Sequence, residues 1–228
     1  MNSIESFDRL YRQAGLQSQR RYPNDSLIAF ISSIPQPRNH LRVLEVGCGT
    51  GANLWMIAKE GFNAYGIDSS ETAVNLAKQE LRNTWGVSAE ISVASFDKIP
   101  YADSYFDVVV DVLSLEHESM APAEKSIKEI GRLLRDEGLF FSFRLGDKSS
   151  IFVNSSDSKI DIRTLANISS PNEPYNNNGP ILFSSTEYCE GLFSQANLRI
   201  SKFETLSRTY ENGAFVEYLA IQAKKIVD

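Results

Sequence analysis

The sequence predicts an α/β fold in which a doubly wound, mostly parallel sheet of seven strands ends in an antiparallel hairpin. Short apolar segments rich in branched residues alternate with amphipathic helices from residue 41 to residue 145, which is typical of a parallel sheet with helices on both faces. Asn212-Gly213 then separates two further apolar segments, and Asn-Gly is a strong hairpin signal. A chain of 228 residues is long enough for one domain with a sizeable core.

The first 34 residues are predicted to form two helices that precede the sheet. Apolar side chains recur there at intervals of three and four, as on one face of a helix; they are Ile4, Phe7, Leu10 and Tyr11. The cluster Asn24-Asp25-Ser26 is a typical helix start, and the segment from Pro35 to Pro37 ends the second helix.

Five strands and three helices are predicted between residues 41 and 145. The strands are residues 41–46, 64–67, 91–93, 106–112 and 139–143, and the helices are residues 52–59, 69–82 and 122–134. Gly138 is expected to end the turn before the fifth strand. Right-handed crossovers would bring the carboxyl ends of these strands to one edge of the sheet, where ligands bind.

Residues 146–180 interrupt this alternation and are predicted to form a lid-like insertion. The segment is dense in Ser, Asn and Pro, and a loop of this length in a compact domain is usually a lid or disordered. A helix over residues 186–196 follows, and two strands over residues 198–206 and 214–223 complete the sheet.

The composition disfavours several classes of partner. The net charge is −6, and an acidic surface repels phosphate backbones, so no nucleic-acid partner is expected. No apolar segment approaches the roughly 20 residues of a membrane span, and residues 1–16 lack the apolar centre of a signal peptide. Cys48 and Cys189 show no metal-ligand spacing. These features predict a cytoplasmic protein with reduced thiols and leave its oligomeric state open.

The turn after the first strand is the most informative feature. Three glycines, Gly47, Gly49 and Gly51, lie between an apolar strand and a helix. Main chain without side chains can approach a bulky ligand, and the free amides of the helix can donate to an anionic group. Asp68 ends the second strand about twenty residues later, where a carboxylate can accept both hydroxyls of a ribose. Together these residues predict a nucleoside-binding site.

Two kinds of cofactor fit the glycine loop and Asp68: a dinucleotide, and a nucleoside that carries a positive charge. Gly47, Gly49 and Ala52 also satisfy the dinucleotide fingerprint, so an oxidoreductase that uses NAD(P) is one alternative. Glu45 argues against it, because a carboxylate just before the loop opposes a pyrophosphate but suits a cationic ligand. Gly51 also argues against it, because Gly47, Gly49 and Gly51 are spaced more closely than the residues of the dinucleotide fingerprint.

Two later segments extend the pattern. Residues 95–109 lead into the fourth strand, and residues 128–138 lead into the fifth. With residues 43–51 and 65–70, they resemble the class I S-adenosylmethionine-dependent methyltransferases over about residues 41–145. Asp136-Glu137 departs from the family's usual Pro-Gly. The resemblance implies a Rossmann-like fold and S-adenosylmethionine as the cofactor.

The resemblance also implies which residues of the glycine loop hold the cofactor. The main chain of Gly47, Cys48, Gly49 and Gly51 would lie under its methionine and ribose portions. Glu45 would support the loop or the ammonium end of the methionine.

The ends of the next three strands supply the other implied ligands. Asp68, with Ser69 beside it, would hold the ribose hydroxyls, and Ser95 and Phe96 would flank the adenine. Many relatives carry an acid at the position of Ser95 to bind the exocyclic amine. Asp111 or its carbonyl would face the methionine ammonium.

His117 is the predicted general base. It follows the fourth strand beside the expected cleft, and a base is needed only when the acceptor keeps its proton at neutral pH. The adjacent Glu116 and Glu118 are expected to raise its pKa. Tyr22 lies in the segment of residues 1–34, which in many relatives folds over the cofactor.

The acceptor is expected to be a small polar metabolite, such as a sugar or a natural-product intermediate. The Asn/Asp-Pro-Pro-aromatic motif of amino-methylating nucleic-acid enzymes is absent after the fourth strand, and Asp111 and Asp147 are too few for a metal site. Arg144 would bind an anionic acceptor or form an exposed ion pair. A non-catalytic cofactor-binding module and an aminopropyl transferase are further alternatives.

Overall fold

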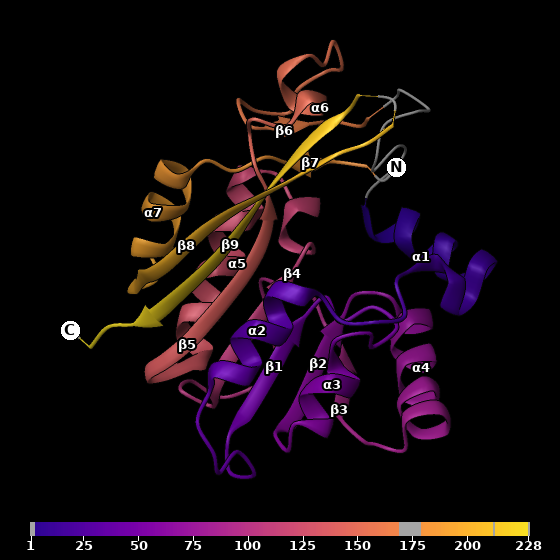
Figure 1. Cartoon of the computed structure of the whole chain (residues 1–228), viewed down its shortest axis with the longest axis vertical. Coiled ribbons are helices and arrows are strands. Elements are labelled where there is room, and N and C mark those ends of the chain that lie inside the picture. The colour runs from indigo at the N-terminus through magenta and orange to yellow at the C-terminus, as the bar shows by residue number, and fades with distance from the viewer. Residues whose placement is uncertain (1–2, 169–178, 212, 228) are drawn as a thin grey trace.

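The computed structural model describes residues 3–168, 179–211 and 213–227 and confirms the predicted fold (Figure 1). Its main sheet has seven strands in the order β3-β2-β1-β4-β5-β9-β8. The first five strands are parallel, and β9 pairs with β5 and β8 in the antiparallel sense. The strand order reverses between β1 and β4, so the loops after these two strands meet at a topological switch point.

The strands follow the apolar segments of the sequence. Their bounds are β1 Arg42–Val46, β2 Asn63–Asp68, β3 Glu90–Val93, β4 Phe106–Val112, β5 Leu134–Leu145, β8 Leu198–Thr209 and β9 Phe215–Lys225. β1 and β4 are almost wholly buried because they form the middle of the sheet.

Helices cover both faces of the sheet. They are α1 Ser3–Ala14, η1 Gly15–Ser18, α2 Asp25–Ser33, α3 Leu54–Lys59, α4 Glu71–Glu80, η2 Leu81–Trp85, η3 Leu115–His117, α5 Met120–Leu133 and α7 Thr186–Ser194. Successive residues of β1 point to opposite faces. Val43 joins the apolar cluster under α2, α3 and α4, whereas Leu44 joins the cluster under α5 and α7. α1 lies at the side of the molecule against α4 (Figure 1).

β5 begins earlier than the sequence predicts. Helix α5 ends at Leu133, and Leu134 already pairs with Phe106 of β4. Gly138 therefore lies inside the strand, and the prediction that it precedes the strand is wrong. A register shift between Phe106 and Val108 accommodates the additional residues, as in a β-bulge.

The insertion between β5 and α7 packs on the antiparallel end of the sheet. It contains α6 Ser150–Val153 and a two-stranded sheet of β6 Thr164–Leu165 and β7 Ile181–Leu182. Residues 169–178 of the predicted lid lie outside the described part. The apolar side chains of the described part of the insertion form a third apolar cluster, which includes Val216 of β9. The two ends of the insertion meet, because the Ser184 amide donates to the Leu145 carbonyl and the Asp147 amide donates to the Ser184 carbonyl, both at 2.9 Å.

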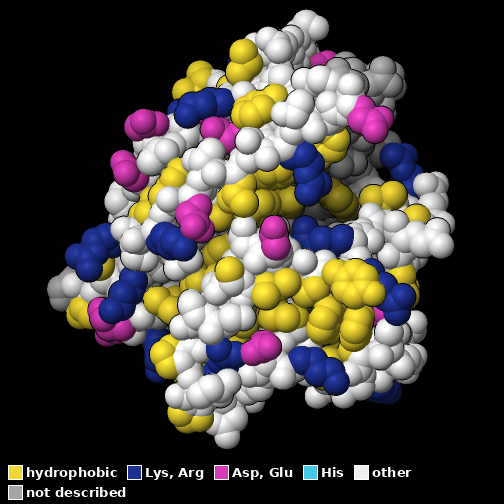
Figure 2. Space-filling model, viewed as in Figure 1, with side chains coloured by type: hydrophobic (Ala, Val, Ile, Leu, Met, Phe, Trp, Pro, Cys, Tyr) yellow, Lys and Arg dark blue, Asp and Glu magenta, His cyan; other side chains and the backbone are white. Residues whose placement is uncertain are grey.

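The surface carries charges of both signs. Figure 2 shows acidic and basic side chains interspersed on the viewed face, with hydrophobic side chains between them. Among the helices that the structure describes, none has the length and apolar character needed to cross a bilayer. The expected cytoplasmic location stays a prediction.

Candidate active site

A cavity of about 300 Å³ lies at the carboxyl edge of the sheet, beneath α1. This volume is at the lower end of the range typical of ligand sites. One part of its lining comes from the loops after β1, β2 and β3, namely Gly47, Asp68, Ser69, Ser95, Phe96 and Asp97. The rest comes from the N-terminal segment, the β4 loop and α5, namely Phe7, Tyr11, Gln19, Leu113, Ser114, His117, Glu118, Pro122 and Lys125.

The glycines after β1 are required by the backbone. Gly47, Gly49 and Gly51 have φ angles of 70°, 50° and 86°, a left-handed region that other residues rarely adopt. Gly47 lines the cavity, and a side chain there would collide with Ser114 of the β4 loop. Gly49 is buried beneath the side chain of Gln19. Of the three, Gly47 therefore presents main chain to the cavity.

The N-terminal segment is tied to the loops that it covers. Oε1 of Gln19 accepts a hydrogen bond from the Thr50 amide at 3.2 Å, and its Nε2 donates to the Tyr11 hydroxyl at 2.6 Å. Burial raises the pKa of Tyr11, which keeps the phenol protonated. The Ser70 hydroxyl donates to Asp8 of α1 at 2.6 Å. These contacts place the segment beside the loops after β1 and β2, and its role in covering a cofactor stays a prediction.

Asp68 is the buried carboxylate at the end of β2. Its Oδ2 accepts from the Gly49 amide and its Oδ1 from the Ser70 amide, each at 2.9 Å. Burial raises the pKa of Asp68, and the two amides act in the opposite direction. The Ser69 amide acts on Asp68 in the same way, and since a carboxylate has about four lone-pair positions, the group still has room to accept from a ligand hydroxyl.

The loop after β3 contributes one acid that the sequence analysis did not single out. Asp97 lines the cavity beside Ser95, whose hydroxyl donates to it at 2.5 Å. It thus supplies a carboxylate two residues beyond the position where many relatives carry one. Phe96 lies beside the main chain of Gly47.

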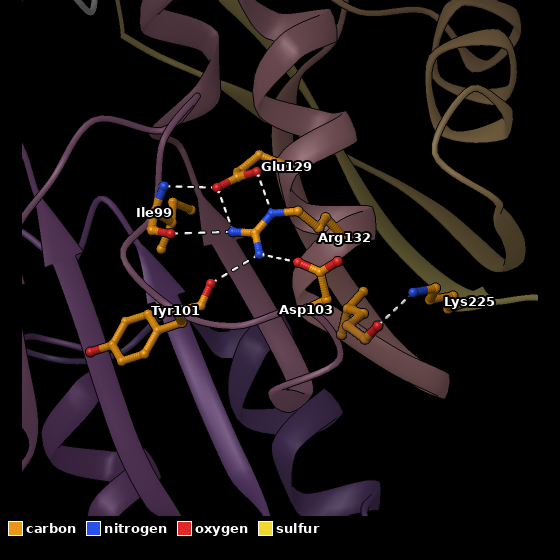
Figure 3. Close-up of polar contacts among 7 residues, drawn as sticks. Ile99, Tyr101, Asp103, Glu129, Arg132 and Lys225 are labelled. Atoms are coloured by element: carbon orange, nitrogen blue, oxygen red, sulfur yellow. Dashed lines mark hydrogen bonds and ion pairs between the residues drawn. The ribbon is translucent and has the colours of Figure 1, made fainter.

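This loop is anchored on α5 by one guanidinium (Figure 3). Arg132 donates to the carbonyls of Ile99 and Tyr101 at 3.2 and 2.9 Å, and it contacts the carboxylates of Asp103 and Glu129 at 2.6 and 2.7 Å. Glu129 in turn accepts from the Ile99 amide at 2.8 Å. These bonds fix to α5 the part of the loop that follows the cavity-lining residues Ser95, Phe96 and Asp97.

Asp111 is fully buried, and its side chain supports the loop after β4 by hydrogen bonds to the main chain of that loop. Its Oδ1 accepts from the amides of Ser114 and Leu115 at 3.1 Å, and its Oδ2 accepts from the Ser142 hydroxyl at 2.8 Å. Nη1 of Arg144 lies 4.0 Å from Oδ2. Burial raises the pKa of Asp111, and the Arg144 guanidinium opposes that shift. Arg144 is itself fully buried, so the alternative of an exposed ion pair is wrong.

His117 lines the cavity as an uncharged imidazole. It contacts Phe7 with ring centroids 4.5 Å apart, and its ring N–H donates to the Pro180 carbonyl. Burial lowers the pKa of His117 to about 4. The expectation that Glu116 and Glu118 raise this pKa is therefore wrong, because the cost of desolvating the charged ring outweighs them.

Two glutamates flank this histidine. Glu118 lines the cavity, and its Oε1 accepts from the Ser126 hydroxyl at 3.0 Å. Its Oε2 is buried and has no hydrogen-bond partner within the described part of the chain. Burial raises the pKa of Glu118 to about 7. Glu116 is fully buried and does not line the cavity, and neither of its oxygens has a hydrogen-bond partner among the described residues.

Some predicted ligands lie away from the cavity. Glu45 is buried and accepts from Nδ2 of Asn53 at 2.5 Å, and burial raises its pKa to about 8. Tyr22 is exposed and packs edge-on against Trp85, with ring centroids 6.3 Å apart. The predicted residues that line the cavity are Gly47, Asp68, Ser69, Ser95, Phe96 and His117, whereas Glu45, Cys48, Gly49, Gly51, Asp111 and Tyr22 do not. Their roles toward a cofactor stay predictions.

Comparison with known proteins finds similarity to methyltransferases. Residues 44–142 match the family model described as a methyltransferase domain. The whole fold is similar to that of an S-adenosylmethionine-dependent methyltransferase from Methanosarcina mazei, with a TM-score of 0.73 and 18% identity over 91% of this chain and 100% of that one.

The chain also matches curated relatives. A ubiquinone biosynthesis O-methyltransferase from Agrobacterium fabrum is 29% identical over 47% of this chain and 42% of its own length. A sterol 4-C-methyltransferase from Caenorhabditis elegans is 26% identical over 83% of this chain and 54% of its own length. The chain therefore spans about half the length of these relatives.

The match to a methyltransferase domain favours S-adenosylmethionine over NAD(P) as the cofactor. The residues that line the cavity fit S-adenosylmethionine. The main chain of Gly47 is open to the cavity, and Asp68 keeps lone pairs free for ribose hydroxyls. Carboxylates of Asp68, Asp97 and Glu118 surround the cavity, which suits the positive charge of a sulfonium.

Proposed function

We propose that this chain transfers the methyl group of S-adenosylmethionine to a small metabolite with polar groups. One observation carries the proposal: a single cavity joins the residues suited to the cofactor to a second set from the β4 loop and α5. The strand order supports it, because β4 lies next to β1 on the side away from β2 and β3. A cofactor held over β1 and β2 would leave the β4 side of the cavity for an acceptor.

The work of the protein in such a transfer is mainly alignment. The sulfonium supplies an electrophilic methyl group when the cofactor is bound. The chain must hold the acceptor in line with that group, and alignment alone can lower a barrier by about 7–11 kcal/mol. The buried Asp111 assists, because its bonds to the amides of Ser114 and Leu115 fix the β4 loop that faces the cofactor side.

The acceptor side of the cavity favours a molecule with an apolar body and polar substituents. Phe7, Leu113 and Pro122 offer apolar contact, whereas Glu118 and Lys125 offer charge. The curated relatives include an O-methyltransferase and a C-methyltransferase, so both oxygen and carbon acceptors occur among similar proteins. We infer a metabolite as the substrate class, and the −6 net charge argues against nucleic acid.

Two measurements test this function. Calorimetry should give micromolar binding of S-adenosylhomocysteine and no binding of NAD⁺ or NADP⁺. Incubation with methyl-labelled cofactor and a metabolite extract should then yield a labelled small molecule that mass spectrometry identifies. Tight binding of the homocysteine compound without any transfer would instead support a non-catalytic cofactor-binding module.

A further inference from the structure

We propose that Glu118 is the catalytic base of this site and that the acceptor it serves is a phenolic hydroxyl. The inference rests on the proposed methyl transfer and names the proton acceptor and substrate class for it.

The geometry of Glu118 suits a base. It lies between η3 and α5, on the acceptor side of the cavity. The hydroxyl of Ser126 donates to its Oε1 at 3.0 Å, which fixes the carboxylate against α5. Its Oε2 is buried and has no hydrogen-bond partner among the residues that the structure describes, although buried polar atoms are nearly always paired. A hydroxyl of a bound acceptor would satisfy that oxygen.

The other ionisable groups of the cavity are less suited to this role. His117 has its pKa lowered to about 4 by burial, so its imidazole is a weak base. Both oxygens of Asp68 already accept main-chain amides, and Asp97 accepts from Ser95 at an exposed position. The ammonium of Lys125 has no lone pair to accept a proton. Glu118 is the remaining carboxylate on the acceptor side.

Burial and groups on four neighbouring segments set the pKa of Glu118. Burial raises its pKa to about 7, the Ser126 hydroxyl and the Arg144 guanidinium lower it, and Asp111 and Asp97 raise it further. A carboxyl group with this pKa is substantially ionised at neutral pH and is still basic enough to take a proton efficiently.

The strength of this base favours a phenol over an aliphatic alcohol. A phenolic hydroxyl such as that of tyrosine has a pKa of about 10, only about 3 units above that of Glu118. Water, which an aliphatic alcohol resembles, has a pKa of roughly 16. The cavity walls fit an aromatic ring as well, because Phe7, Phe96 and Pro122 present flat apolar surfaces.

The reaction balances in atoms and charge. A lone pair of the phenolic oxygen forms the new O–C bond, and the methyl C–S bond breaks with its electron pair remaining on sulfur. The hydroxyl proton passes to Oε2 of Glu118, which becomes a neutral carboxylic acid and later releases the proton to water. One positive and one negative charge are thereby removed together from a largely buried site.

The test compares E118Q with the wild type and with E124Q, which makes the same change on α5 outside the cavity. The probes are catechol and 4-nitrophenol, whose hydroxyl is already largely ionised at about pH 8. E118Q should lower kcat for catechol by about 100-fold or more, as general-base loss typically does, and should affect 4-nitrophenol far less. E124Q should behave as the wild type.

Three readouts keep the result interpretable. The wild-type kcat should fall on the acid side of about pH 7, and this limb should vanish in E118Q. Affinity for S-adenosylhomocysteine should stay within about twofold in both variants. Unchanged kcat of E118Q with catechol, or a wild type that binds the homocysteine compound but methylates neither phenol, overturns the assignment. Failure of the wild type to bind that compound contradicts the proposed function itself.

Discussion

Phe7 of α1 lies edge-on against the imidazole of His117, with ring centroids 4.5 Å apart and ring planes at 69°. This contact joins the first helix of the chain to the loop after β4, across the mouth of the cavity. The bond from Ser70 to Asp8 ties the same helix to the loop after β2. Helix α1 therefore forms one wall of the cavity, with Phe7 and Tyr11 in its lining.

Removing the Phe7 ring should expose His117 and raise its pKa from about 4 toward the ordinary value of about 6.5. The F7A variant would be titrated by NMR in a His40→Asn background, because His40 and His117 are the two histidines of the chain. F7L keeps the apolar cover and should leave the titration near its wild-type position. An unshifted F7A titration would show that another group buries the imidazole.

Asp68→Ala should weaken binding of S-adenosylhomocysteine by about 1.5–3 kcal/mol, through the loss of charged hydrogen bonds to ribose. Calorimetry measures the affinity, and Asp25→Asn, an exposed change on α2, is the control. Because Asp68 also accepts from the amides of Gly49 and Ser70, the free energy of unfolding must be measured in parallel. Unchanged affinity in a folded variant would mean that the ribose is held elsewhere.

Glu45→Gln should stabilise the protein increasingly as the pH rises from about 4.5 to 8. The folded pKa of Glu45 is about 8, so the folded state keeps a proton that the unfolded state releases above about 4.5. Wild-type stability therefore falls with rising pH in that window, and glutamine removes the effect. Near pH 7 the gain should be about 2–3 kcal/mol, measured by urea denaturation.

The control for this change is Glu190→Gln on α7, where the carboxyl is exposed. It should leave stability unchanged within about 0.5 kcal/mol at every pH. A Glu45 variant whose advantage does not grow with pH would mean that the carboxylate is ionised in the folded protein, held by a cation such as Arg20.

Arg144→Ala should destabilise the fold by about 3–5 kcal/mol, because it leaves the buried Asp111 without its cation. Replacing both partners by neutral groups, Arg144→Met with Asp111→Asn, should cost much less than the sum of the single changes. Urea denaturation of the four proteins in this double-mutant cycle gives the coupling energy. Purely additive effects would show that the two side chains do not interact at 4.0 Å.

The sheet could be predicted because each parallel strand is a short apolar segment between helix signals. Phe106–Val112 is buried almost throughout, and its predicted bounds are those observed. The start of β5 was missed for a physical reason. Residues 135–137 are charged and exposed and lie at the register shift between the pairs Phe106–Leu134 and Val108–Leu139, so they leave no apolar signal in the sequence.

The candidate site was predictable only where local sequence carries the chemistry. Gly47 follows β1 directly and Asp68 ends β2, so their position at the sheet edge could be inferred. Gln19 follows η1 and Glu118 precedes α5, and both reach the cavity through tertiary contacts that no local pattern encodes. The pKa of His117 was predicted in the wrong direction because sequence shows neighbouring charges but not burial.

The two ends of the insertion lie side by side. The main-chain hydrogen bonds that join Leu145, Asp147 and Ser184 bring the chain back to the place where it left β5. The hydroxyls of Ser149 and Ser150 also accept from the amides of Glu217 and Phe215, which fixes the start of the insertion to β9. Because loop closure depends only weakly on loop length, the insertion can vary in length between these anchored ends while β5 stays paired with β9.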